Sequence, residues 1–157
     1  SLTGYLKLSN YEKFSIEDFN LYLNINYLAN QLFIRKLIKN MKSKKWGRIL
    51  TCSSIGTKFG GNKNTFLYSL SKYMNEFFPA IFKDISKFNI LTNCMQIGVT
   101  DTKIHKKDRK KNLNERTKLI PIKRSAKPEE IAKYIYHIAS EKNTYINLQK
   151  LNIAGGE

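Results

Sequence analysis

Two short apolar runs, separated by a long helical segment, constrain the fold of this chain more than any other feature. Residues 48–54 read RILTCSS and residues 89–97 read NILTNCMQI. Runs this short and this apolar are typical of strands that are buried on both faces, as in parallel sheets. Strands that alternate with long helices indicate parallel crossovers. We therefore predict an α/β fold with a Rossmann-type doubly wound parallel sheet.

Two long segments carry apolar residues at helical spacing. The first covers residues 16–41, with Ser15 as its N-cap, and Gly47 is predicted to stop it. The second covers about 65–87 and contains Pro79, which predicts a kink or a boundary inside that segment. The first is predicted to be a long amphipathic helix, and the second has its own apolar set at helical spacing.

The last third of the chain is predicted to hold one helix and one strand. Residues 99–126 form a long polar connection, and Pro128 suits the first turn of the helix that follows. Residues 148–157, LQKLNIAGGE, predict a short strand that leads into a Gly-Gly turn. The chain has 157 residues, of which 41% are hydrophobic, so we predict a single domain over 1–157.

The cysteines and the charge limit the classes of function. Cys52 and Cys94 lie in the two apolar runs, so we predict buried free thiols, a cytoplasmic environment and no metal site. No stretch reaches the ~20 apolar residues of a membrane span, so no membrane partner is predicted. The net charge is +16, but the lysines accompany an excess of asparagine and isoleucine along the whole chain. Nucleic-acid binding is therefore a third-ranked hypothesis, and no nucleic acid is predicted as a partner.

The spacing of Tyr68 and Lys72 indicates a chemical site. The two residues are four apart, so they share one face of the second helix. An ammonium group near a phenol favours the phenolate, so Lys72 is expected to lower the pKa of Tyr68. A tyrosine adjusted in this way exchanges a proton with a carbonyl or an alcohol. Ser54 ends the preceding strand, at the edge where open α/β sheets bind their ligands.

Five segments, in order, give the chain a resemblance to the short-chain dehydrogenase/reductase family. The match runs over nearly the whole chain and combines a helix entry, a strand with its serine, a Tyr-x-x-x-Lys pair, a second strand and a C-terminal Gly-Gly. The segments are EDFNLYLNIN (17–26), GRILTCSSIG (47–56), YSLSK (68–72), NILTNCMQIGVTDT (89–102) and the stretch from KRSAKPEEIA to LNIAGGE (123–157).

The resemblance implies a catalytic role for each matching residue. Tyr68 would be the general acid or base, and Lys72 would adjust its pKa and bind the nicotinamide ribose. Ser54 would orient the substrate oxygen, with Ser53 as the competing serine. Asn26 would anchor a water that links Lys72 to solvent as a proton relay.

The resemblance also implies a nicotinamide cofactor, NAD or NADP. Ile97, Gly98 and Val99 would pass close to the nicotinamide, and Thr102 would contact its carboxamide, with Thr100 as the alternative. The reaction would be hydride transfer between this cofactor and a carbonyl or alcohol carbon of a small-molecule substrate.

The sequence departs from the family pattern at the cofactor motif. Its eight glycines form neither GxxxGxG nor GxGxxG, and Ile97 replaces the proline that usually precedes the glycine at position 98. We therefore expect the chain to be the C-terminal catalytic part of such a Rossmann fold. The alternative hypothesis is a catalytically silent fragment or pseudoenzyme that acts as a binding or assembly subunit.

Two further features predict partners. Residues 103–118 are strongly basic and match the family's mobile lid, with His105 as part of it. The segment is either a solvated, flexible charge run or a lid over an anionic substrate. The helices 16–41 and 65–87 match those that pack in the family's dimers, so we predict a homodimer or homotetramer. This packing would explain outward-facing aromatic side chains: Phe77, Phe78 and Phe82.

Overall fold

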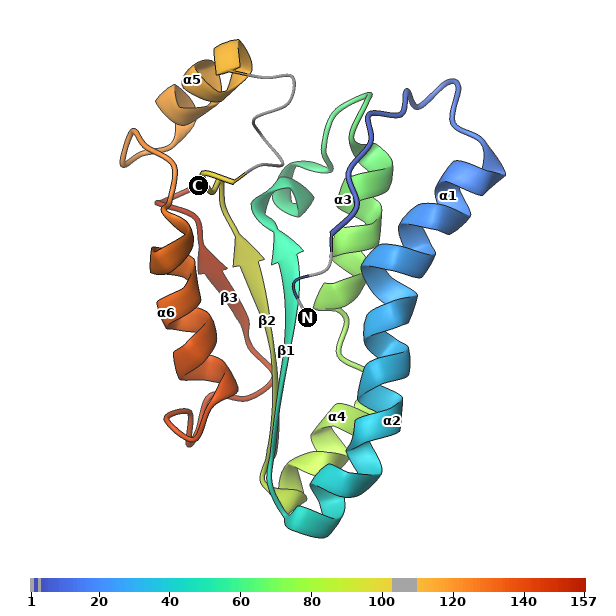
Figure 1. The fold of residues 1–157 in the computed structure, drawn as a ribbon, viewed down its shortest axis with the longest axis vertical. Coiled ribbons are helices and arrows are strands. Elements are labelled where there is room, and N and C mark those ends of the chain that lie inside the picture. Colours follow the sequence, from blue (N-terminus) through green and yellow to red (C-terminus); the bar gives the residue numbers. More distant parts are fainter. Residues whose placement is uncertain (1, 3, 103–109) are drawn as a thin grey trace.

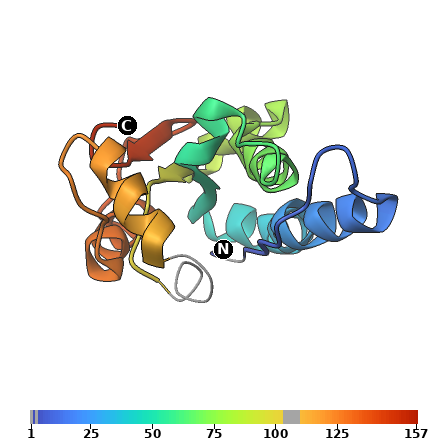
Figure 2. The same ribbon diagram turned by 90° about the horizontal axis from the view of Figure 1, so that it is seen from above.

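The computed structural model describes residues 2, 4–102 and 110–157. Three parallel strands form one sheet in the order β1-β2-β3. They are β1 (Gly47–Ser54), β2 (Ile90–Ile97) and β3 (Lys150–Ile153). The two apolar runs became β1 and β2, which pair along their full length from Gly47 opposite Ile90 to Ser54 opposite Ile97. The predicted doubly wound parallel sheet is confirmed, because helices cover both of its faces (Figures 1 and 2).

The first helical segment lies on one face of the sheet and is longer than predicted. It consists of α1 (Ile16–Leu23), a π-helical turn at Asn24–Leu28 and α2 (Ala29–Lys44). Ser15 caps it as expected, because its hydroxyl accepts a hydrogen bond from the Asp18 N–H at 3.1 Å. Helix α1 contacts the later helix α3 (Phe66–Tyr73), and α2 contacts β1.

The prediction that Gly47 stops this helix is wrong. The helix ends at Lys44, and Lys45 takes the left-handed conformation with φ 49°. Gly47 is the first residue of β1, and a Cβ there would lie 2.7 Å from the Met41 sulfur. The glycine therefore permits the close approach of strand and helix rather than ending the helix.

The second helical segment is broken rather than continuous. It contains α3 (Phe66–Tyr73), a 3₁₀ turn at Met74–Glu76, α4 (Ala80–Asp84) and a second 3₁₀ turn at Ile85–Phe88. The interruption falls at Phe77–Pro79, because proline lacks an N–H and forces the preceding residue out of helical geometry. The break rotates α4 relative to α3. Phe82 consequently lies in the core at 3% exposure, which corrects its predicted place on an outward surface.

The core has one apolar cluster on each face of the sheet. On the face of α2 and α4, Ile49 and Ile90 pack with Phe82 and Ile85. On the other face, helix α6 (Pro128–Ala139) packs its Ile131 against the sheet, together with Ile138, Leu50 and Met95. Adjacent residues of β1 thus serve opposite faces, as a strand buried on both sides requires. Cys52 and Cys94 are buried and free, as predicted.

The connection 99–126 contains a helix that the sequence did not predict. Residues Lys110–Leu119 form α5, a polar helix above the carboxyl ends of the strands (Figure 1). Residues 103–109 of the predicted lid, with His105, lie outside the described part of the chain, and the rest of the lid belongs to α5. Among the described residues, no helix is long and apolar enough to cross a membrane.

Candidate active site

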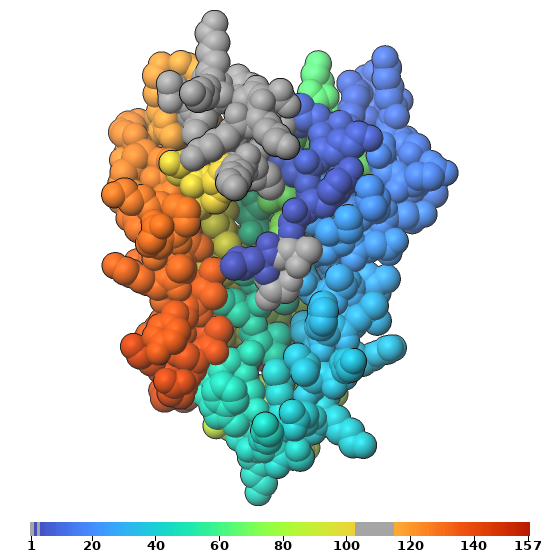
Figure 3. All heavy atoms as spheres, in the orientation of Figure 1, coloured from blue at the N-terminus to red at the C-terminus, as the bar shows by residue number. Residues whose placement is uncertain are grey.

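A cavity of about 660 Å³ opens at the carboxyl ends of β1 and β2. Its walls come from the N-terminal segment, the ends of β1 and β2, helix α3 and helix α6. The space-filling view shows the N-terminal segment running between the α2 and α6 layers (Figure 3). Seven of the predicted site residues line it together: Ser54, Tyr68, Lys72, Ile97, Gly98, Val99 and Thr102.

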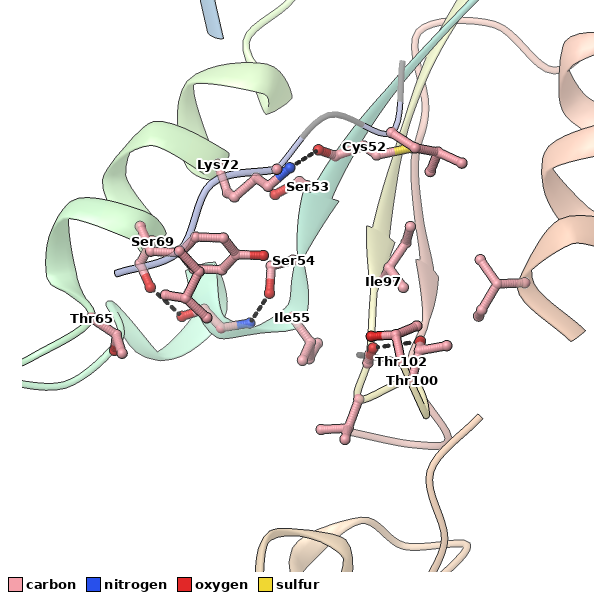
Figure 4. A pocket seen from close by; sticks show the side chains of 18 of the residues that line it. Cys52, Ser53, Ser54, Ile55, Thr65, Ser69, Lys72, Ile97, Thr100 and Thr102 are labelled. Atoms are coloured by element: carbon pink, nitrogen blue, oxygen red, sulfur yellow. Dashed lines mark hydrogen bonds between the residues drawn. The ribbon is translucent and has the colours of Figure 1, made fainter. Parts of the chain in front are cut away.

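Ser54 faces this cavity from the last position of β1. Its hydroxyl accepts a hydrogen bond from the Gly56 N–H at 3.2 Å and caps the short 3₁₀ helix Ile55–Phe59 (Figure 4). The same hydroxyl is a hydrogen-bond partner of the Tyr68 phenol. The competing serine, Ser53, is buried and donates its hydroxyl to Glu76 at 2.6 Å. The geometry therefore favours Ser54 over Ser53 as the serine that meets a substrate.

Tyr68 lies on α3 with its phenol largely buried. Burial raises the pKa of Tyr68 above its ordinary value of 10.0, while the hydrogen bond from Ser54 acts in the opposite direction. This corrects the sequence prediction that Lys72 lowers the pKa of Tyr68. The physical reason is that the loss of solvent at this phenol outweighs the hydrogen bond from Ser54.

Lys72 is buried one helical turn further along α3, at 5% exposure. Its Nζ lies 6.0 Å from the centre of the Tyr68 ring and donates to the Cys52 carbonyl oxygen at 3.4 Å (Figure 4). Burial lowers the pKa of Lys72. A Cβ on Gly4 would lie 3.6 Å from this Nζ, so the N-terminal segment passes directly over the ammonium group.

Asn26, the remaining predicted catalytic residue, is not among the described residues that line the cavity. It occupies the π-helical turn, a distortion common at functional sites. Its amide exchanges two hydrogen bonds with the Tyr5 backbone, at 2.7 and 3.0 Å, and donates to Ser71 at 2.9 Å. Its backbone carbonyl accepts from the side chains of Asn30 and Asn75, at 3.1 and 2.9 Å. Asn26 thus anchors the N-terminal segment above Lys72; its predicted role in a proton relay stays a prediction.

The opposite wall comes from the end of β2. Gly98 donates its N–H to Ile153, and a Cβ there would lie 2.6 Å from the Ala154 Cα, so only glycine fits. Thr100 and Thr102 both line the cavity, but Thr100 is buried and its hydroxyl already donates to the Gly98 carbonyl at 3.1 Å. This geometry favours Thr102 over Thr100 as a ligand-contacting residue.

Sequence reasoning missed Glu76, whose buried carboxylate binds Ser53 and Thr57, on either side of Ser54. Its signal is its spacing, because Tyr68, Lys72 and Glu76 follow at intervals of four within the predicted helix 65–87.

Arg116 belongs to the basic segment 103–118 that the sequence singles out. It lies on α5, lines the cavity and forms an ion pair with Glu157. The sequence carries no signal for which basic residue of that segment lines the cavity.

Comparison with known proteins places these features in a family. A family model described as enoyl-(acyl carrier protein) reductase matches residues 2–157. The 3-oxoacyl-(acyl-carrier-protein) reductases of Aquifex aeolicus and Chlamydia trachomatis are 26% and 30% identical to the chain; each alignment covers 92% of it and 58% of the relative. An L-rhamnose 1-dehydrogenase (NADP(+)) of Thermoplasma acidophilum is 27% identical over 98% of this chain and 61% of its own. The chain thus spans about three-fifths of these relatives.

Solved structures confirm the fold. A 3-oxoacyl (acyl-carrier-protein) reductase from Agrobacterium tumefaciens with NADP bound superposes with a TM-score of 0.88 and 19% identity, over 99% of this chain and 62% of its own. ElxO with NADP bound gives a TM-score of 0.87 and 23% identity, over 98% of this chain and 64% of its own.

Proposed function

Because this chain belongs to the short-chain dehydrogenase/reductase family, we propose that it carries the catalytic centre of an NAD(P)-dependent oxidoreductase acting on a carbonyl or alcohol carbon. The observation that carries the proposal is one cavity that holds the Ser54 hydroxyl, its hydrogen-bond partner Tyr68 and the buried Lys72 ammonium. Proton transfer and carbonyl orientation need these three groups together.

Tyr68 supplies the proton in the proposed reaction. Its raised pKa keeps the phenol protonated at neutral pH, which suits reduction, where a proton must reach the carbonyl oxygen. Ser54 lies next to this phenol and holds the same oxygen by a hydrogen bond. In the reverse direction Tyr68 accepts the alcohol proton. The apolar wall of α6 limits water around the reacting atoms.

The residues present fit the nicotinamide end of NAD or NADP, which supplies or accepts the hydride when bound. Gly98 brings the ends of β2 and β3 together, and Val99 and Thr102 line the same wall of the cavity. Lys72 would bind the ribose from the opposite wall. The Gly-rich turn that holds a pyrophosphate in such folds does not occur within the 157 residues.

We propose an anionic small-molecule substrate. Arg116 contributes a guanidinium to the cavity wall. Its ion pair with Glu157 holds it in place while about a third of the side chain stays exposed. An arginine held in this way can bind a carboxylate or phosphate through two parallel hydrogen bonds.

We also propose that the chain works as a homodimer or homotetramer. Large apolar side chains remain exposed along the first helical segment, on α3 and just after it, with Phe33 at 65% and Phe77 at 66%. Exposed apolar residues gathered on neighbouring elements are typical of an interface. They are Leu28 in the π-helical turn, Leu32, Phe33 and Leu37 on α2, Leu70 and Tyr73 on α3, and Phe77 after it.

The test of the activity combines cofactor binding with a substituted enzyme. The full-length gene product is titrated with NADPH and NADH and assayed with a short 3-oxoacyl thioester. We expect Tyr68→Phe to lower kcat/KM at least about a hundredfold while cofactor binding persists. Tyr73→Phe, an exposed tyrosine on the same helix, is the matched control and should behave as the wild type. Failure to bind either cofactor, or full activity of Tyr68→Phe, would overturn the proposal.

A further inference from the structure

A buried carboxylate lies behind the strand that carries Ser54. Glu76 belongs to the 3₁₀ turn after α3, and its side chain is 3% exposed. Its Oε1 accepts two hydrogen bonds of 2.6 Å, one from the Ser53 hydroxyl and one from the Thr57 hydroxyl. A buried carboxylate is costly unless hydrogen bonds replace its water, so these two bonds keep it in place.

The two donors flank Ser54 in the sequence and in space. Ser53 is the penultimate residue of β1, and Thr57 lies in the 3₁₀ helix that follows Ser54. The Thr57 hydroxyl oxygen also lies 2.8 Å from the Ser54 carbonyl oxygen and accepts from the Gln96 amide at 3.3 Å. One carboxylate oxygen thus joins both ends of the turn from Ser53 to Thr57. The hydrogen bond between Thr57 and Gln96 ties that turn to β2.

We propose that Glu76 is a positioning residue. By accepting hydrogen bonds from Ser53 and Thr57, Glu76 fixes the Ser53–Thr57 turn and thereby holds the Ser54 hydroxyl beside Tyr68. The proposal rests on the proposed function, because it assigns Ser54 its place in the reaction. Glu76 acts through Ser53 and Thr57, since the described lining of the cavity includes Ser53 but not Glu76.

The hydrogen bonds, rather than the charge, carry this role. The second carboxylate oxygen, Oε2, forms an ion pair with Lys150, whose Nζ lies 3.7 Å away with 46% of its side chain exposed. A pair at this distance and exposure contributes little, because solvent screens it. The two short bonds to Oε1 lie in the protein interior, where such bonds are strong.

Three variants separate these contributions. Glu76→Leu removes both acceptor bonds with little change of volume. Glu76→Gln keeps one carbonyl oxygen for the two hydroxyls and removes the charge. Lys150→Ala removes the ion-pair partner and leaves the hydroxyl bonds intact. The proposal expects Glu76→Gln and Lys150→Ala to resemble the wild type and Glu76→Leu to differ from both.

The first readout needs neither cofactor nor substrate. The chain has nine tyrosines, so the ¹³Cζ signal of Tyr68 is assigned with Tyr68→Phe and then followed by NMR at neutral and alkaline pH. Glu76→Leu should displace the Ser54 hydroxyl from the phenol of Tyr68. The Tyr68 signal should therefore move in Glu76→Leu as it should in Ser54→Ala. Thr51→Val is the matched control, because Thr51 lies on the same strand and donates to the Asn75 backbone instead. An unmoved signal in a folded Glu76→Leu overturns the proposal, whatever the enzyme's activity.

The second readout is kinetic. Glu76→Leu should lower kcat about tenfold or more with KM little changed, because a displaced Ser54 weakens contacts in the transition state. Ser53→Ala combined with Thr57→Val should reproduce this loss, and adding Glu76→Leu to that pair should cost little more. If Glu76→Gln is as impaired as Glu76→Leu, or if the losses simply add, the acceptor role is wrong. If Glu76→Leu does not fold, the NMR signals of Glu76→Gln and of the Ser53/Thr57 double variant decide the question.

Discussion

The Lys72 ammonium lies 6.0 Å from the centre of the Tyr68 ring and donates to the Cys52 carbonyl oxygen. The cation is therefore held by β1, and both groups are largely withdrawn from water. Burial raises the pKa of Tyr68 and lowers that of Lys72, so each shifts toward its neutral form. The hydrogen bond from Ser54 is the contribution that makes the phenol more acidic.

Ser54→Ala should raise the pKa of Tyr68 further, since it removes this bond. Alcohol oxidation needs the phenolate, so its rate should rise with pH until Tyr68 has ionised, and the variant's profile should be displaced to higher pH. The measurement is the pH profile of kcat/KM for alcohol oxidation. Ser43→Ala, on the exposed side of α2, is the control and should leave the profile in place. Superimposable profiles for Ser54→Ala and the wild type would contradict the assignment.

How far the sequence predicts this structure depends on whether a signal is local. The strands β1 and β2 were predictable because burial on both faces produces an uninterrupted apolar run. Ser54, Tyr68 and Lys72 were predictable because two of them share a helix face and the third ends a strand. The raised pKa of Tyr68 was not, because it depends on how much water the N-terminal segment and α3 exclude.

The misplaced Phe82 shows a second limit. Apolar residues continue at helical spacing across Pro79, so the pattern resembles one helix although the backbone is broken there. The break changes the direction in which every later side chain points. Gly47 illustrates the same difficulty, since a glycine after a helix is equally compatible with a stop signal and with a strand packed closely on Met41.

Asn75 should be a major contributor to stability. Its side chain is 1% exposed, donates to the backbone carbonyls of Asn26 and Ser71, and accepts from Asn30. Asn75→Ala removes all three bonds inside the protein, so the free energy of unfolding should fall by about 3 kcal/mol. Denaturant unfolding measures it.

Asn40→Ala gives the matched comparison for Asn75→Ala. Asn40 is exposed on α2, and alanine is the better helix former. The free energy of unfolding of Asn40→Ala should therefore differ from that of the wild type by less than about 0.5 kcal/mol. Equal effects of the two substitutions would show that the buried asparagine contacts contribute nothing beyond helix propensity.

Lys45→Gly should stabilise the protein. Lys45 follows the last residue of α2 with φ 49° and ψ 38°, a conformation that costs a residue with a Cβ about 1 kcal/mol and that glycine adopts freely. The side chain is exposed, so little packing is lost. We expect the free energy of unfolding to rise by about 1 kcal/mol. Lys45→Ala keeps the Cβ and should show no such gain; an equal gain would assign the effect to the lost charge.

Phe33→Glu should weaken self-association. Phe33 is 65% exposed on α2, and Leu37 lies one turn further along the same face at 46%. An interface formed by two copies of this face would bury the glutamate without a partner, which opposes association. Sedimentation of the wild type should show a dimer or tetramer, and Phe33→Glu should shift it to smaller species. Tyr145→Glu, which places the same charge at a 93% exposed site before β3, should sediment as the wild type does. A wild type that is already monomeric would remove the basis of the interface, and an unchanged Phe33→Glu oligomer would place the interface elsewhere.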